Sequence, residues 1–115
     1  MKLPNADRAI VAESKVVRYL LSADHPDGRS KATFFSGFGF RAQQWGAFAR
    51  ALLDQGSTGD VTTVAKSEYG TKYSVDGSIR TPDGRNPRVR TVWITDSEHA
   101  APRLITAHPL RRHHV

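Results

Sequence analysis

Three side chains that could act on a phosphate fall within seven residues, at His25, Arg29 and Lys31. An imidazole titrates near neutral pH and can transfer a proton, whereas a guanidinium and an ammonium can bind a phosphate or the charged transition state of phosphodiester cleavage. A proline and a glycine between them predict a turn, and the hydroxyl of Ser30 suits the N-cap of a helix. We therefore expect His25 to act as acid or base, and Arg29 and Lys31 to clamp a phosphate. The competing interpretation is that His25 makes a hydrogen bond within the turn, and that Arg29 and Lys31 are solvated at the start of the helix.

A second group of candidates falls on segments that alternate like β-strands. Lys72, Arg90 and Arg103 are expected on one sheet face, where they could contact the phosphates of a substrate. Thr91 and Thr106 are expected on adjacent strands, where each hydroxyl could hydrogen-bond an oxyanion or a sugar hydroxyl. The competing interpretation is structural, because threonine is common in strands without any function.

Other cations in the C-terminal half have a functional and a structural interpretation. Arg85, Arg88 and Arg90 near Trp93 fit base stacking with phosphate contact. A charged hairpin tip above a buried tryptophan explains Arg85 and Arg88 as well. His108 follows the last expected strand and is a second candidate acid or base.

The charge of the chain favours an acidic partner. The 115 residues carry a net charge of +6, and the 17 basic residues are twelve arginines and five lysines. Arginine binds phosphate through a planar, two-pronged guanidinium. A nucleic acid is the polyanion that this balance favours. General solubility, or neutralisation by a small acidic partner protein, would also account for it.

Several classes of protein are disfavoured by what the sequence lacks. Without cysteine there are no disulfides or thiolate metal sites. The carboxylates are scattered and no H-x-x-x-H pattern occurs, so we expect neither a metal nor another cofactor. No apolar run reaches the roughly 18 residues of a membrane span, and no signal peptide is evident. We expect one domain over residues 1–110, a flexible basic tail over 111–115, no membrane partner and a cytoplasmic location.

The order of expected elements predicts an α+β fold. Apolar spacing predicts three helices, which cover residues 13–22, 30–38 and 42–55. Later segments alternate like strands, at 61–64, 69–80, 89–95 and 103–107. We expect about three N-terminal helices packed on one face of a four-stranded antiparallel β-meander, which leaves the other face open.

The sequence resembles a small bacterial domain family of unknown function. The resemblance rests on four motifs, M-K-L-P-N-A-D-R-A, D-H-P-x-G-R-x-K-A-x-F-F, Y-G-x-K-Y-x-V-D and the closing V-x-T-V-W-I…P-R-L-I-T-A-x-P-L. They span nearly the whole chain, from Met1 to Leu110. The closing motif of that family has tyrosine where this chain has His108, which argues against a general-acid role for this histidine.

The order of helices and strands, together with the R-L-I-T-A-x-P ending, is also similar to the barnase/EndoU/colicin/RelE-like superfamily of ribonuclease toxins. This resemblance implies metal-independent RNA cleavage on the open sheet face and a neutralising partner protein. The site residues that it implies in this chain are His25, Arg29, Lys31, Lys72, Thr91 and Thr106. The transfer is an analogy between folds.

The function predicted from these observations is a metal-independent endoribonuclease of bacterial toxin type, from a toxin–antitoxin or polymorphic toxin system, with RNA favoured over DNA. One alternative is a non-catalytic nucleic-acid-binding module. Another is a protein-interaction or antitoxin-like domain whose cationic face binds an acidic protein.

Overall fold

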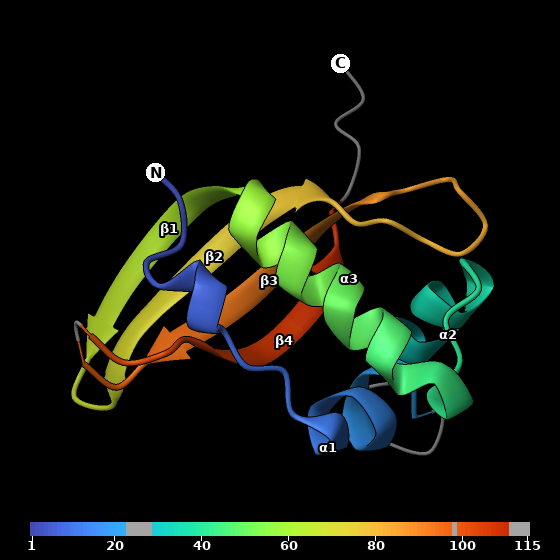
Figure 1. The fold of residues 1–115 in the computed structure, drawn as a ribbon, viewed down its shortest axis with the longest axis horizontal. Helices are drawn as coiled ribbons and strands as arrows, with labels where there is room; N and C mark the ends of the chain where they lie inside the picture. Colours follow the sequence, from blue (N-terminus) through green and yellow to red (C-terminus); the bar gives the residue numbers. More distant parts are fainter. Residues whose placement is uncertain (23–28, 98, 111–115) are drawn as a thin grey trace.

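The helices occupy the first half of the chain, as the apolar spacing predicts (Figure 1). The computed structural model describes residues 1–22, 29–97 and 99–110, so the predicted tail over 111–115 lies outside the described residues. The main helices are α2 (Arg29–Gly37) and α3 (Trp45–Thr58), and the shorter turns are η1 (Ala6–Arg8), α1 (Glu13–Lys15), η2 (Val16–Leu20) and η3 (Ala42–Gln44).

Four strands form one antiparallel sheet in chain order, β1-β2-β3-β4. They are β1 (Asp60–Ser67), β2 (Gly70–Ser78), β3 (Arg88–Thr95) and β4 (Arg103–Pro109). Each strand pairs with the next one along the chain, which is the pattern of a meander. The predicted α+β fold, helices followed by a four-stranded antiparallel sheet, is confirmed.

Helix α3 lies across one face of the sheet and forms the core with it (Figure 1). Its Phe48 and Leu52 are fully buried, as are Val75 of β2 and Trp93 of β3. Alternate residues of a strand point to opposite faces, so the odd-numbered positions of β2 and β3 face α3. The even-numbered positions of these two strands therefore face the other way.

Helices α1 and α2 lie beside β4 rather than over the centre of the sheet (Figure 1). Both α1 and α2 contact β4. Before α1, Ile10 forms a single parallel bridge with Arg103 of β4. These contacts place α1 and α2 at the sheet edge that β4 forms.

Candidate functional site

An irregularity in β4 decides which of its side chains face away from α3. Thr106 pairs with Val92 and His108 pairs with Arg90, and the register shifts between these pairs and the pair of Trp93 with Leu104. Paired residues share a sheet face, so Thr106 and His108 lie on the face opposite α3. The shift inserts Ile105 as an extra residue and lets Arg103 share that face.

Lys31 joins α2 to this face of the sheet. Its Nζ atom donates a hydrogen bond to the Tyr19 hydroxyl at 2.6 Å and another to Thr106 Oγ1 at 2.7 Å. The two oxygens are themselves 3.4 Å apart. Three functional groups from η2, α2 and β4 thus converge, and all three residues are half-buried.

Tyr19 belongs to a π-helical turn, η2, an uncommon structure that often marks functional sites. Burial raises the pKa of its phenol, but hydrogen bonds with Lys31 and Thr106 and the positive charges of Lys31 and Lys15 outweigh this, so the pKa lies below its usual value. The Nζ atoms of Lys31 and Lys15 lie 4.8 Å and 5.3 Å from the centre of the ring. A phenol in this setting deprotonates more readily than a free tyrosine.

Arg90 is held on the same face by a carboxylate. Its Nε and Nη2 atoms donate to the two carboxylate oxygens of Asp76 at 2.7 Å and 2.8 Å. These hydrogen bonds lower the pKa of Asp76 and raise that of Arg90. The two-pronged geometry fixes the guanidinium plane.

His108 completes the cluster because it pairs with Arg90 across the strands. Burial lowers its pKa, and the charges of Lys31 and Arg90 lower it further, whereas Asp76 acts in the opposite direction. The lowered pKa favours the neutral imidazole, the form that can accept a proton.

The structure brings together some of the predicted site residues and leaves others apart. Lys31, Thr106 and Arg90 lie on or beside the face opposite α3. Lys72 and Arg103 flank Ile94 in one cross-strand row of that face, and Arg103 forms an ion pair with Asp96 at 2.9 Å. We call Tyr19, Lys31, Asp76, Arg90, Thr106 and His108 the β4 cluster.

Two predicted residues remain untested by these contacts. His25 lies outside the described residues. Arg29 begins α2, but its side chain also lies outside the described part of the chain.

The predicted position of Thr91 beside Thr106 on the open face is wrong. Thr91 has no solvent exposure and faces α3, where its hydroxyl donates to Gln55 Oε1 at 2.6 Å and accepts from Trp93 Nε1 at 2.7 Å. Thr91 lies two positions from both Val89 and Trp93 along β3, so all three side chains point to the same sheet face, towards α3. Thr91 therefore helps to satisfy a polar network in the core.

Arg80 follows β2 and lies away from the β4 cluster. It lines a hollow beside α3, together with Asp54 and Asn86. The cations of the chain are thus distributed over more than one surface.

Two members of the β4 cluster were not among the predicted site residues. Tyr19 lies among the apolar residues of V-V-R-Y-L-L, and its position there is typical of a helix face that packs on the core. Asp76 is one of the scattered carboxylates in the sequence. Its position opposite Arg90 in the β2–β3 pairing is the signal that could have revealed it.

Two general features complete the description. Within residues 1–22, 29–97 and 99–110, no three histidine or acidic side chains lie close enough together to hold a metal ion. None of the helices in that same part of the chain combines the length and hydrophobicity needed to cross a membrane.

Residues 2–111 match the model of a protein family described as a domain of unknown function, DUF6883. The chain belongs to the DUF6883 family. The expected resemblance to a small domain family of unknown function is thereby confirmed. No curated protein sequence matches this chain.

The DUF6883 chain shares its fold with a solved structure described as a contact-dependent growth inhibition toxin–immunity protein complex from Klebsiella pneumoniae 342. The TM-score is 0.72, the sequence identity is 12%, and the match covers 96% of this chain and all of the other. At this identity the likeness establishes the fold alone.

Proposed function

We propose that this protein is a metal-independent endoribonuclease of bacterial toxin type. The observation that carries the proposal is the contact of Lys31 with both Tyr19 and Thr106, next to His108 and Arg90. An ammonium, a phenol, an imidazole and a guanidinium can supply the base, the acid and the charge stabilisation for metal-free phosphodiester cleavage.

The proposed reaction is an internal transfer on RNA. A base accepts the proton of the 2′-hydroxyl, the 2′-oxygen bonds to phosphorus, and the 5′-oxygen leaves with a proton from an acid. The products are a 2′,3′-cyclic phosphate and a new 5′-hydroxyl. DNA lacks the 2′-hydroxyl, so RNA is the proposed substrate.

Each residue of the β4 cluster has a role in this scheme. Neutral His108 accepts the proton of the 2′-hydroxyl, because its lowered pKa keeps it unprotonated at pH 7. Tyr19 supplies the proton to the 5′-oxygen, since its lowered pKa eases proton loss. Lys31 stabilises the charge that develops on the phosphate oxygens, and Thr106 hydrogen-bonds the sugar.

Further residues contribute to binding in this proposal. Arg90 contacts the reacting phosphate, and Lys72 and Arg103 contact phosphates further along the same face. His25 and Arg29 remain proposed as an additional acid or base and an additional phosphate ligand, because they lie six and two positions before Lys31 in the sequence.

The toxin type is supported by the fold shared with a chain of a toxin–immunity complex. A toxin of this kind would act on RNA in the cytoplasm. A small acidic protein that covers the cationic face would neutralise it, since complementary charge accelerates such association.

The test is incubation of the purified protein with total RNA in EDTA, at pH values from 5 to 9. We expect cleavage with a cyclic phosphate end, detected by its resistance to phosphatase until acid opens the ring. Lys31→Met should remove the activity, and Lys66→Met is the matched control because Lys66 is an exposed lysine of β1. An absence of cleavage by the folded wild-type protein at every pH would contradict the proposal.

A second candidate function is an immunity-like or other protein-binding domain, because the complex that shares the fold contains an immunity protein as well as a toxin. Expression in bacteria separates the two. A toxin arrests growth, and Lys31→Met relieves the arrest. A protein-binding domain or a non-catalytic RNA-binding module does not arrest growth through this lysine.

A further inference from the structure

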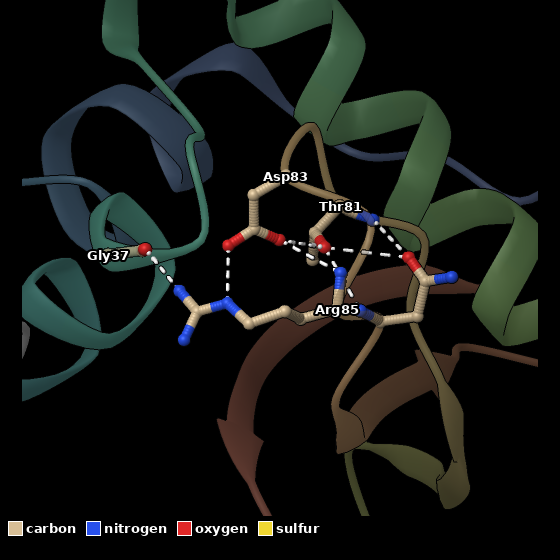
Figure 2. A network of polar contacts seen from close by, with 5 residues as sticks. Gly37, Thr81, Asp83 and Arg85 are labelled. Carbon is tan, nitrogen blue, oxygen red and sulfur yellow. Dashed lines mark hydrogen bonds and ion pairs between the residues drawn. The ribbon is translucent and has the colours of Figure 1, made fainter.

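The loop between β2 and β3 holds the C-terminal end of α2 (Figure 2). Arg85 Nη2 donates to the carbonyl oxygen of Gly37 at 2.8 Å, and Gly37 is the last residue of α2. Carbonyl groups at a helix end lack partners within the helix, so a guanidinium there is both a hydrogen-bond donor and a favourable charge.

Arg85 is itself fixed within the loop. Its Nε atom donates to Asp83 Oδ2 at 2.6 Å, and its backbone N–H donates to Asp83 Oδ1 at 3.0 Å. Thr81 Oγ1 also donates to Asp83 Oδ1, at 2.8 Å, as Figure 2 shows. The guanidinium therefore has a set orientation before it reaches α2.

The contact extends to the residues that follow α2. The Arg85 guanidinium lies 4.2 Å from the centre of the Phe38 ring, and the N–H of Asp83 donates to the Phe38 carbonyl at 3.3 Å. Gly39 approaches Pro82 so closely that a Cβ atom at Gly39 would lie 2.9 Å from the proline ring. The loop thus holds three consecutive residues at the end of the helix.

The same helix presents Lys31 to the β4 cluster. Lys31 lies six positions before Gly37, a distance of about 9 Å along a helix axis. A shift or rotation of α2 moves both ends together, because a two-turn helix behaves as a rigid unit over that length. The Lys31 Nζ atom reaches its two oxygens only if α2 keeps its present position.

We propose that Arg85 is a positioning residue, which holds α2 so that Lys31 contacts Tyr19 and Thr106. Its importance for cleavage rests on the proposed ribonuclease function, whereas its effect on the Lys31–Tyr19 contact does not. Arg85 is a cation with no phosphate-binding role in this proposal, because its guanidinium already contacts Gly37, Asp83 and Phe38.

The test compares Arg85→Ala, Arg85→Lys and the wild type, with Arg50→Ala as the control for loss of one exposed arginine. The first readout is the NMR titration of ¹³C-labelled tyrosines, in which exposed Tyr69 is an internal reference. We expect the pKa of Tyr19 to rise towards its ordinary value in Arg85→Ala. Arg85→Lys should show a smaller rise, since an ammonium keeps the charge but not the two-pronged geometry.

The second readout is RNA cleavage. Displacing a catalytic group by about 1 Å can lower a rate about 100-fold, so we expect Arg85→Ala to lower kcat by roughly 10- to 100-fold with little change in KM. The dependence of binding on salt should stay as in the wild type, because no phosphate contact is lost.

The outcomes separate the two proposals. If the wild type cleaves no RNA, the ribonuclease proposal fails, but a raised Tyr19 pKa in Arg85→Ala still supports the positioning role. An unchanged Tyr19 pKa in both folded Arg85 variants overturns that role, whatever the activity. A Tyr19 shift of equal size in Arg50→Ala also overturns it, because the cause would then be net charge.

Discussion

Lys31 Nζ lies 2.7 Å from Thr106 Oγ1, although 75 positions separate the two residues in the chain. This contact joins the first turn of α2 to the last strand. Because Tyr19 shares the same ammonium, the helical half and the sheet half of the chain each contribute to one cluster.

Replacement of Lys31 by methionine tests the centre of the cluster. The aliphatic stem remains while the charge and both hydrogen bonds disappear, so the pKa values of Tyr19 and His108 should both rise. We expect ribonuclease activity to fall by about 100-fold or more, the scale of losing one preorganised charge-stabilising donor. NMR titration and a cleavage assay measure the two effects. Unchanged activity would remove Lys31 from the proposed mechanism.

The pH dependence of activity should follow His108. Its pKa in the folded protein lies below the ordinary value of about 6.5, so the neutral base persists as the pH falls below 6.5. Lys31→Arg retains a positive charge, so the pH below which the activity falls should stay as low as in the wild type. In Asp76→Asn the imidazole loses a favourable negative neighbour, and its pKa should fall further. Single-turnover cleavage rates from pH 4.5 to 8 give the profile. If the fall of activity at low pH is the same in His108→Gln, His108 is not the group whose protonation causes it.

Stability at low pH should also reflect His108. A histidine whose pKa is lowered on folding binds its proton more readily in the unfolded chain. The contribution to the free energy of unfolding is therefore complete above pH 6.5 and decreases as the pH falls through the folded pKa. Urea unfolding at pH 7.5 and pH 5 should show a smaller decrease for His108→Gln than for the wild type.

The Asp76–Arg90 ion pair should stabilise the fold at neutral pH. The side chain of Asp76 is only 14% exposed, so Asp76→Asn leaves the guanidinium with a weaker partner and should lower the free energy of unfolding by about 1–3 kcal/mol at pH 7. Because the folded pKa of Asp76 is lowered, the difference from the wild type should shrink as the pH falls through that pKa. Chemical denaturation at several pH values measures this. A constant difference at all pH values would contradict an electrostatic origin.

Two glycines of α3 should respond oppositely to alanine. A Cβ atom at Gly56 would lie 2.6 Å from the ring of buried Trp93, whereas a Cβ at Gly46 meets nothing within 4 Å. Gly56→Ala should therefore cost about 1–3 kcal/mol through overpacking. Gly46→Ala should be neutral or stabilise by up to about 1 kcal/mol, because alanine favours helices. Thermal unfolding of both variants checks the contrast.

Much of the fold could be predicted from local sequence patterns. Alternation predicts the strands, and the residue types of Pro82-Asp83-Gly84 favour a turn between β2 and β3. The predicted third helix ended at Gln55, because G-S-T-G resembles a linker, whereas α3 continues to Thr58. The hydroxyls of Ser57 and Thr58 donate to the carbonyl oxygen of Asp54, which stabilises this last turn.

The site was less predictable because it depends on register and on contacts between distant segments. Thr91 could have been placed correctly, since it shares its parity with Val89 and Trp93. The face of His108 depends on the irregularity at Ile105, which simple alternation does not reveal. The role of Tyr19 depends on a π-helical turn and on Lys31, and neither leaves a periodic signature.

The π-helical turn at Val16–Leu20 has a consequence for length variation in this family. A π turn, with its i→i+5 hydrogen bonds, accommodates about one residue more than an α-helical turn. Removing one residue here would restore 3.6-residue winding and rotate Tyr19 by about 100° relative to Leu21 and the chain beyond it. Homologues that lack this extra residue would therefore carry a helix of the same composition in which the phenol points away from the lysine.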